Sequence, residues 1–538
     1  MIFALLVLGL VTIGPAWAQG EAEIEQAAAP SFDQSLAQLT DRSLKIKSAA
    51  AEAIATGGDE RAAQVLDALL HGRLFYRKSD KLIVYAEKQD GDYRITDVLR
   101  GDSLGDAAKG DLKKISVNNK MRRQMRAAIA GLTLGDADPK VRLGAVQEMT
   151  SGLDADVADQ LRARLELEQD AEVLEALELA VALADLKSPD AEIRLAAVAS
   201  LEGSLEPVVR NRLTTLREQG ESPDVKAAAA KALESIERTI QLNAAAETLF
   251  FGLSLGSVLV LAAIGLAITF GVMGVINMAH GELIMIGAYT TYLVQQAMPN
   301  GIEYSLFVAI PAAFLVSGAF GVAIERLVIR FLYGRPLETL LATFGISLIL
   351  QQLVRTTISA QNVAVENPAW MSGSLQVNPA LSITYNRLYV ILFALVVFAG
   401  LLLILKRTAL GLQVRAVSQN RAMARAMGVR SARVDALTFG LGAGIAGVAG
   451  VALSQLTNVG PNMGQAYIID SFMVVVFGGV GNLWGTLIGG MTLGVANKFL
   501  EPWAGAVLAK IFVLVFIILF IQKRPRGLFP QRGRAAES

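Results

Sequence analysis

The chain of 538 residues has no cysteine and only two histidines, His71 and His280. Without cysteine it can form no disulfide bond, no thiolate zinc site and no iron–sulfur cluster. Two histidines so far apart also argue against a histidine-based metal site. No GxxxxGK[ST] segment is present, so the chain encodes no P-loop ATPase. We therefore expect neither an enzyme with catalytic residues nor a metal or cofactor site.

The net charge of zero hides two halves of different chemistry. Residues 1–247 contain 40 acidic and 30 basic residues, whereas residues 248–538 contain 9 acidic and 19 basic ones. Neither half has a basic patch interleaved with aromatic residues, so nucleic acid is not an expected partner. The difference in charge and hydropathy predicts at least two domains.

The N-terminal stretch MIFALLVLGLVTIGPAWA is apolar and ends in Ala16-Trp17-Ala18, the small-x-small pattern of a cleavage site. We interpret residues 1–18 as a signal peptide, although a basic n-region is missing. The alternative is an uncleaved N-terminal anchor. Both interpretations predict that residues 19–247 are exported.

The exported part divides into two regions. Residues 19–117 form a periplasmic segment with a small β element, because two β-prone runs at 82–85 and 93–95 flank the turn-forming Gln89-Asp90-Gly91-Asp92. Residues 118–245 are helical and repetitive, as DPKVRLGAV, DAEVLEALEL, DAEIRLAAVASL and SPDVKAAAAKAL show. Most of these segments open with an Asp that can cap a helix.

Aligning these segments places four apolar residues at one position, and a unit of 52 residues recurs once. The residues are Val141, Val173, Ile193 and Val225. This pattern predicts stacked helix pairs, a HEAT-like α-solenoid, whose surface typically binds other proteins. The alternative is an ordinary helical bundle without internal symmetry.

After Glu247 the composition becomes strongly apolar, and several stretches approach the ~20 residues that cross a bilayer. Because backbone groups in lipid must bond internally, we expect helices throughout. The predicted fold class is all-α: a polytopic bundle of about 8–9 membrane helices in residues 248–530, preceded by the exported repeat domain. The stretches lie near 248–270, 283–298, 305–325, 338–357, 387–405, 436–455, 466–482, 483–499 and 505–522.

Basic residues predict the orientation of these helices. Arg326, Arg330 and Arg335 mark one inside loop, residues 406–433 mark a second, and the C-terminal QKRPRGLFPQRGR marks an inside end. Residues 358–386 have no Lys or Arg and should lie outside. Nine crossings that start outside satisfy these constraints. They predict a multi-pass protein of the bacterial inner membrane with a periplasmic N-terminal domain and a cytoplasmic C-terminus.

The stretch INMAHGELIMIGAY carries Asn277, His280 and Glu282 within an apolar region. Because a charge in the bilayer costs at least ~2.5–3.5 kcal/mol, such groups face protein or a hydrated path. Three polar residues so spaced do not share one face of a regular helix. They favour a helix interrupted near Gly281, or a cytoplasmic turn between the first two crossings. We predict that they contact the solute path; the alternative is a turn that satisfies freed backbone groups.

Three further polar residues are candidates for the same path: Thr343, Asp470 and Asn482. Asp470 lies near the expected outer end of a helix and could instead be only an N-cap. The many glycines in 439–453 and 477–490 are best explained by close helix packing.

The inside segment 407–440 is basic and helical. Asn420 can cap a short helix that ends at Gly428. Such a helix at the inner face is suited to docking another protein, helped by the apolar Ala422, Met423, Ala426 and Met427. The alternative is a solvated positive-inside loop.

Four motifs together resemble the branched-chain amino acid type of ABC transporter permease: GVMGVINMAHGELIMIGAY, VRAVSQNRAMARAMGV, VVVFGGVGNLWGTLIGG and RPRGLFP. The resemblance covers about residues 248–530. Where the family commonly has Phe, this chain has Met278. Within the exported extension, VNNKMRRQMRAAIAGLTLGD looks like the urea transporter permease of bacteria.

The resemblance implies a permease subunit of an ATP-driven importer, with urea as the first candidate solute and branched-chain amino acids or short amides as alternatives. It also implies a second homologous permease, two cytoplasmic ATPases and a periplasmic solute-binding protein as partners, within membrane lipid. The helix 421–427 would be the coupling helix, and the residues implied in coupling are Arg415, Asn420, Arg421, Ala424 and Gly428. A hypothesis of another class is a membrane-anchored scaffold or sensor.

Overall fold

The computed structural model describes residues 30–89, 92–220 and 222–530, so the predicted signal peptide lies outside the described residues. The chain forms two compact units. The first comprises residues up to 202 together with 208–233, and the second comprises 203–207 together with residues from 234 onward.

The first unit begins with four helices packed on a sheet. The five strands are antiparallel in the order β4-β3-β2-β1-β5. This sheet, which ends at Lys114, is larger than the small β element that the sequence predicts, so the all-α fold class does not hold for this region. Leu74 of β1 and Ile83 of β2 are buried against the helices. The elements are α1 (Phe32–Gln38), α2 (Leu44–Thr56), α3 (Ala62–Leu70), α4 (Asn119–Thr133), β1 (Leu74–Arg77), β2 (Ile83–Gln89), β3 (Asp92–Asp97), β4 (Ser103–Ala107) and β5 (Leu112–Lys114).

The predicted hairpin is confirmed as the pairing of β2 with β3, in which Gln89 faces Asp92. Both β-prone runs, 82–85 and 93–95, lie on these strands apart from Leu82. The two residues at the tip of the turn lie outside the described residues.

The helices after residue 138 repeat with a fixed spacing. The starts of α5, α6 and α7 each recur 52 residues later as the starts of α8, α9 and α10. Four of these helices, α5 to α8, follow an aspartate whose side chain accepts a backbone N–H of the first turn, as expected. The elements are α5 (Pro139–Ser151), α6 (Ala155–Leu165), α7 (Ala171–Asp185), α8 (Ala191–Ser200), α9 (Pro207–Gln219) and α10 (Pro223–Met273).

The four aligned residues have the environments that such a repeat requires. Val173 and Val225 are both 1% exposed, whereas Val141 and Ile193 are 38% and 44% exposed. Aligned residues that stand 52 positions apart therefore have the same degree of burial, whereas the two aligned residues within one unit differ in burial. The predicted unit of helix pairs is wrong, because the recurring unit contains three helices; a relation to HEAT repeats stays a prediction.

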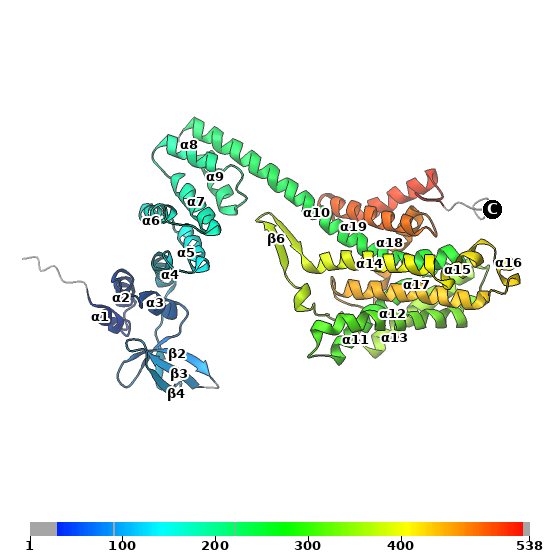
Figure 1. The fold of residues 1–538 in the computed structure, drawn as a ribbon, viewed down its shortest axis with the longest axis horizontal. Helices are drawn as coiled ribbons and strands as arrows, with labels where there is room; N and C mark the ends of the chain where they lie inside the picture. Colours follow the sequence, from blue (N-terminus) through cyan, green and yellow to red (C-terminus); the bar gives the residue numbers. More distant parts are fainter. Residues whose placement is uncertain (1–29, 90–91, 221, 531–538) are drawn as a thin grey trace, which may run out of the picture. The chain divides into compact units, whose positions relative to one another are not determined.

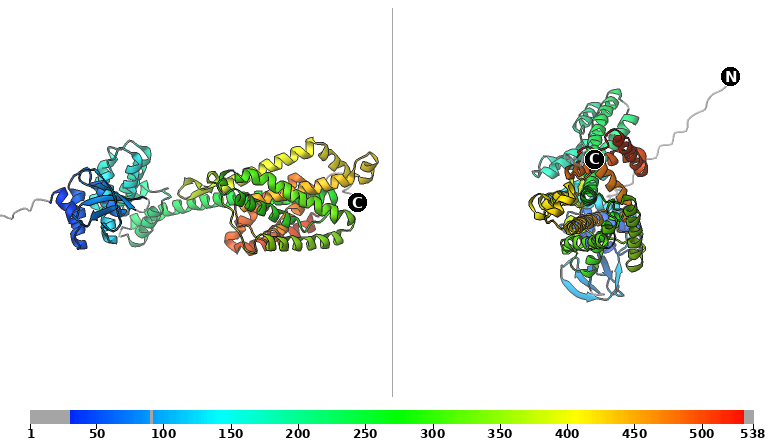
Figure 2. Two further views of the ribbon diagram at one scale, coloured as in Figure 1. Left: turned by 90° about the horizontal axis from the view of Figure 1, so that it is seen from below. Right: turned by 90° about the vertical axis from the view of Figure 1, so that its right-hand side faces the viewer.

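The second unit is a bundle of long apolar helices (Figures 1 and 2). Six described helices are long and apolar enough to cross a membrane: α10, α12 with η1, α13, α14, α17 and α19. Helices α11 and α18 have only 18 and 16 residues. The elements are α11 (His280–Ala297), α12 (Ile302–Leu327), η1 (Ile329–Phe331), α13 (Pro336–Thr357), η2 (Ala369–Met371), β6 (Ser374–Asn378), β7 (Leu381–Thr384), α14 (Tyr385–Arg407), α15 (Ala409–Gln419), α16 (Arg421–Ala426), α17 (Ser431–Ser454), α18 (Met463–Gly478) and α19 (Leu483–Lys523).

Helix α19 consists of two arms that meet at Gly505, which has non-helical φ 77° and ψ 160°. In the first arm, Gly485 and Gly489 lie beside Gly478 and Val474 of α18, so the two run in opposite directions. In the second arm, Lys510 pairs with Asp470 and Phe520 packs on Phe477, so this arm runs parallel to α18. The chain therefore turns back at Gly505. The nine predicted apolar stretches thus fall on nine helical segments among the described residues, while the number of crossings stays a prediction.

Helix α17 is the centre of the bundle. In its most apolar stretch 94% of the residues are buried, against 17% in the corresponding stretch of α19 and 22% in that of α14. Glycines allow this packing: a Cβ on Gly287 of α11 would lie 2.0 Å from the Gly447 carbonyl oxygen of α17. Close packing through small residues is the usual way in which membrane helices associate.

Candidate functional site

The chain between α10 and α11 is a helix break inside the bundle, which we define as residues 274–279. Helix α10 ends at Met273 and α11 begins at His280. Yet the His280 Nε2 atom lies 2.8 Å from the carbonyl oxygen of Ala262, three turns before the end of α10. At ~1.5 Å per residue, the helix break therefore runs back about 16 Å along α10. The chain is thus non-helical just before Gly281, and the choice between a broken helix and a turn between the first two crossings stays a prediction.

The three polar residues of this stretch are buried and only partly satisfied. Asn277 and His280 are 0% exposed and Glu282 is 1% exposed. Asn277 Oδ1 accepts the Ala279 N–H at 3.0 Å, and His280 Nε2 donates to Ala262. Each residue retains one buried atom without a hydrogen-bond partner among the described residues, namely Asn277 Nδ2, His280 Nδ1 and Glu282 Oε2. A buried unsatisfied polar group costs about 1–3 kcal/mol, so this arrangement is expensive for a purely structural turn.

A polar stripe on α13 faces the helix break. Its members recur every four residues and so lie on one face of the helix. Glu282 Oε1 accepts hydrogen bonds from Ser347 Oγ and Gln351 Nε2, both at 2.8 Å. Thr343 Oγ1 accepts the Met278 N–H at 3.1 Å. The polar stripe comprises Thr339, Thr343, Ser347, Gln351 and Arg355, of which the first four are buried. Sequence reasoning found only Thr343, although the four-residue spacing is readable in the chain.

Of the other candidates, Asp470 does not join this cluster. It lies inside α18, which begins seven residues earlier at Met463, so the N-cap interpretation is wrong. Its Oδ2 atom is 3.1 Å from Lys510 Nζ of α19. Asp470 therefore ties α18 to the second arm of α19.

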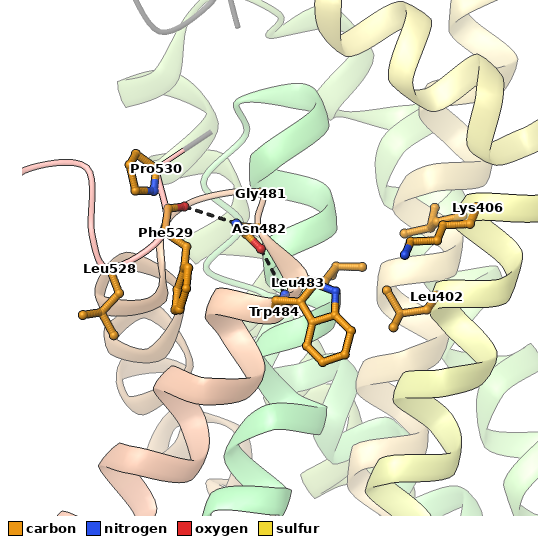
Figure 3. A pocket seen from close by; sticks show the side chains of 10 residues that line it. Leu402, Lys406, Gly481, Asn482, Leu483, Trp484, Leu528, Phe529 and Pro530 are labelled. Carbon is orange, nitrogen blue, oxygen red and sulfur yellow. Dashed lines mark hydrogen bonds between the residues drawn. The ribbon is translucent and has the colours of Figure 1, made fainter. Parts of the chain in front are cut away.

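Asn482 also lies apart, at the start of α19 (Figure 3). Its Oδ1 atom accepts the N–H groups of Trp484 and Gly485 at 3.1 and 3.2 Å, and its Nδ2 donates to the Phe529 carbonyl at 3.3 Å. A groove of about 740 Å³ between α14 and α19 adjoins it, with Lys406 at the rim. Asn482 thus joins the two C-terminal motifs rather than the helix break.

Burial limits what the cluster does in this conformation. His280 packs against α10, where a Cβ on Gly265 would lie 2.8 Å from its Cε1 atom. Glu282 lies equally close to Gly464 at the start of α18, where a Cβ would be 2.8 Å from Oε2. The three side chains lie inside one chain and line no open surface here, so contact with solute stays a prediction that requires movement of these helices.

The segment predicted to dock another protein, residues 420–428, has the predicted local structure and is called the knob below. Asn420 Oδ1 accepts the Met423 N–H at 2.9 Å, α16 follows, and Gly428 adopts a left-handed φ of 84°. Met423 and Met427 are 61% and 79% exposed. The outer side of the knob is thus a small apolar surface, as expected for a docking element.

Arg421 and Ala424 point the other way. Arg421 donates to both carboxylate oxygens of Asp435 in α17, at 2.6 and 3.0 Å. Ala424 is 5% exposed and packs among apolar residues of α15 and α17. Burial opposes the charge of Arg421, but the hydrogen bonds to Asp435 raise its pKa above the ordinary value. Both side chains thus contact the bundle rather than the outer side of the knob, and their role in coupling stays a prediction.

Arg415 is exposed and donates to the Leu405 carbonyl at the end of α14. It fixes α15 against α14. Of the five predicted coupling residues, Asn420 and Gly428 shape the knob, and the other three hold it in place. Met423 and Met427 are the large apolar side chains exposed on the knob, beside the exposed Ala422 and Ala426.

Buried polar groups among apolar, membrane-length helices typically mark a solute or ion path. Residues 248–521 match the model of the family described as "Branched-chain amino acid transport system / permease component". The chain belongs to this family of transport permeases, which are not enzymes.

Relatives extend the comparison over the same half of the chain. The LivH permease of high-affinity branched-chain amino acid transport in Salmonella typhimurium (strain LT2) is 33% identical over 291 residues, covering 52% of this chain and 94% of the relative. BraD of Pseudomonas aeruginosa is 31% identical over 287 residues (52% and 93%). The ribose import permease RbsC of Escherichia coli K12 is 26% identical over 254 residues (45% and 75%). No solved structure matches the chain.

Proposed function

We propose that the chain is the membrane-spanning permease subunit of an ATP-driven importer. The family match over residues 248–521 carries this proposal. It is supported by the absence of a P-loop in the sequence and by the exposed apolar knob, because energy must then come from a bound ATPase. The proposed complex contains two cytoplasmic ATPases, a second homologous permease and a periplasmic solute-binding protein.

Branched-chain amino acids are the solute that the relatives favour. LivH and BraD are both named for this substrate class, whereas the sequence analysis placed urea first. A zwitterion needs both signs of charge along its path. Arg355 of the polar stripe carries a positive charge, and Glu282, which accepts a hydrogen bond from Gln351 of the stripe, carries a negative one. This pair of charges supports an amino acid as the solute.

Urea or a short amide is the second candidate, and a different observation favours it. The first unit lies outside the family match, and it contains the segment 117–136 that resembles the urea permease; α4 lies within this segment. The unpaired atoms of Asn277 and His280 are neutral hydrogen-bonding groups, which suit an uncharged amide.

The test is uptake by a reconstituted complex. The chain is co-expressed with the ATPase, permease and binding-protein genes beside its own, purified, and placed in liposomes. ATP-dependent uptake of labelled leucine and labelled urea is then compared, with an ATPase variant lacking its P-loop lysine as control. Saturable uptake of one solute identifies it. If the chain captures no ATPase and moves neither solute, the scaffold or sensor hypothesis replaces the proposal.

A further inference from the structure

The knob is attached to the bundle by one charged contact. The Asp435 side chain is 2% exposed, and the Arg421 guanidinium that it binds is 29% exposed. Both carboxylate oxygens are engaged, so the contact is a bidentate fork of the kind that fixes geometry as well as charge. Removing Arg421 would leave the charge of the buried Asp435 uncompensated.

The same guanidinium joins a third element. Its central carbon lies 4.8 Å from the ring centroid of Tyr333, in the turn between η1 and α13. A cation over an aromatic ring is attracted by the ring face. Arg421 of α16 thus connects the start of α17 with the turn that leads into the polar stripe of α13. Arg425 adds a parallel link, because its Nε donates to Ser431 Oγ at 2.7 Å.

Helix α17 leads from this contact to the helix break. Gly442, two turns beyond Asp435, lies against Gly265 of α10, where a Cβ on Gly265 would be 2.3 Å from the Gly442 carbonyl oxygen. The His280 ring lies at the same place, 2.8 Å from that Cβ position. Packing this close transmits displacement, since neither helix can shift without moving the other.

We propose that the Arg421–Asp435 pair, backed by Tyr333, is the joint through which movement of the knob reaches α17 and the helix break. This inference rests on the proposed function and deepens it. The three residues are positioning residues: they touch neither the solute nor the ATPase. The exposed Met423 and Met427 bind the partner ATPase, and the buried side of the knob transmits the movement of the ATPase to α17.

The experiment separates ATPase binding from coupling in the full complex. The variants Arg421→Gln and Asp435→Asn remove one charge each, and Arg433→Gln is the control because Arg433 is exposed on α17 near Asp435. Co-purified ATPase, ATP hydrolysis and solute uptake are measured for each. We expect the ATPase to bind in all variants, while solute moved per ATP falls about tenfold in the first two, the factor that ~1.4 kcal/mol represents.

Two double variants keep the inference falsifiable if the single ones fold poorly. Arg421→Asp with Asp435→Arg restores opposite charges and should recover coupling above either single variant. Arg421→Met with Asp435→Leu replaces the pair by apolar groups, which is often tolerated for stability, but should leave coupling low. Three results would contradict the proposed role of the pair. These are normal coupling in Asp435→Asn, no recovery of coupling when the two charges are exchanged, and a loss of ATPase binding in proportion to the loss of uptake. A wild-type complex that binds no ATPase would instead overturn the proposed function.

Discussion

Arg142 and Arg194 stand 52 residues apart and make the same backbone contacts. Arg142 donates to the carbonyl oxygens of Asp136 and Ala137 at 2.8 and 3.0 Å, and Arg194 donates to those of Ser188 and Pro189 at 2.6 and 2.9 Å. Among the described residues, only Arg142 also has a buried acid, Glu168, at 2.7 Å. The equivalent position of the second repeat, 220, is glycine. The repeats therefore share a scaffold but differ in one ion pair.

We expect Glu168→Gln to destabilise α5 to α7 by about 3 kcal/mol at neutral pH, because it strands the buried Arg142. Arg194→Gln should cost only about 1 kcal/mol, since it removes hydrogen bonds to carbonyls alone. Hydrogen exchange on the full-length protein measures both. Equal effects of the two substitutions would contradict the difference between the repeats.

The same ion pair predicts a pH dependence. Hydrogen bonding by Arg142 holds the pKa of Glu168 well below its ordinary value of 4.5. A lowered carboxyl pKa gives stability that is present above the ordinary value and is lost as pH falls through the folded-state value. The protection of α5 to α7 should thus fall in acid below about pH 4.5, and Glu168→Gln should remove that dependence.

Gly287→Ala tests the crossing of α11 and α17. Its Cβ would lie 2.0 Å from the Gly447 carbonyl oxygen, so the helices must separate. Overpacking of this kind costs about 1–3 kcal/mol. Gly400→Ala is the matched control, because nothing lies within 4 Å of its Cβ position. The temperature of thermal unfolding in detergent should fall for Gly287→Ala and stay unchanged for Gly400→Ala.

For the helix break, Asn277→Leu, His280→Leu and Glu282→Leu should each reduce uptake per assembled complex. Glu282→Gln should be milder, because its side-chain carbonyl can still accept from Ser347 and Gln351. Ser254→Ala serves as control, since Ser254 Oγ is buried in α10 without a partner. Uptake that falls only in proportion to the amount of complex would mean that the cluster is purely structural.

The absence of cysteine allows a direct test of orientation. Ser374, in β6, and Ser418, in α15, are both exposed and are predicted on opposite sides of the membrane. An impermeant maleimide added to intact spheroplasts should label Ser374→Cys and leave Ser418→Cys unlabelled until lysis. The reverse pattern would invert the predicted topology.

Gly428 tests the shape of the knob. A Cβ there meets nothing within 4 Å, so a substitution is penalised only by its φ of 84°. Gly428→Val should cost about 1–2 kcal/mol and weaken ATPase stimulation, while Gly428→Asn should be tolerated better. Stimulation of the complex by solute is the measurement, and full stimulation in the Val variant would show that the knob is not needed in this conformation.

Local patterns predicted what depends on near neighbours in the chain. The β2–β3 hairpin, the aspartate caps, the Asn420 cap and the nine apolar stretches all follow from residues within a few positions. The 52-residue unit was also predicted from the sequence. The alignment of one apolar residue from each segment did not show that each unit contains three helices. The full extent of the five-stranded sheet was missed because β4 has only Leu104 and Ala107 as apolar residues.

Pairings between distant segments were beyond sequence reasoning. The family resemblance placed Arg421 in the coupling helix but gave no sign of a partner within the chain. Its acid, Asp435, lies fourteen residues away on another helix, and only the fold brings them together. The contact of Glu282 with Ser347 and Gln351 spans 65 and 69 residues.

Helix α10 belongs to the second repeat at its start and to the membrane bundle at its end, without a loop over 51 residues. If the chain is exported as predicted, no linker tells the secretion machinery where transport should stop. The signal has to be the composition itself: Glu247 is the last charged residue before a run without Asp, Glu, Lys or Arg that continues to Gly281. A single charge placed in that run would then change how the newly made chain is inserted before it could alter any contact in the folded protein.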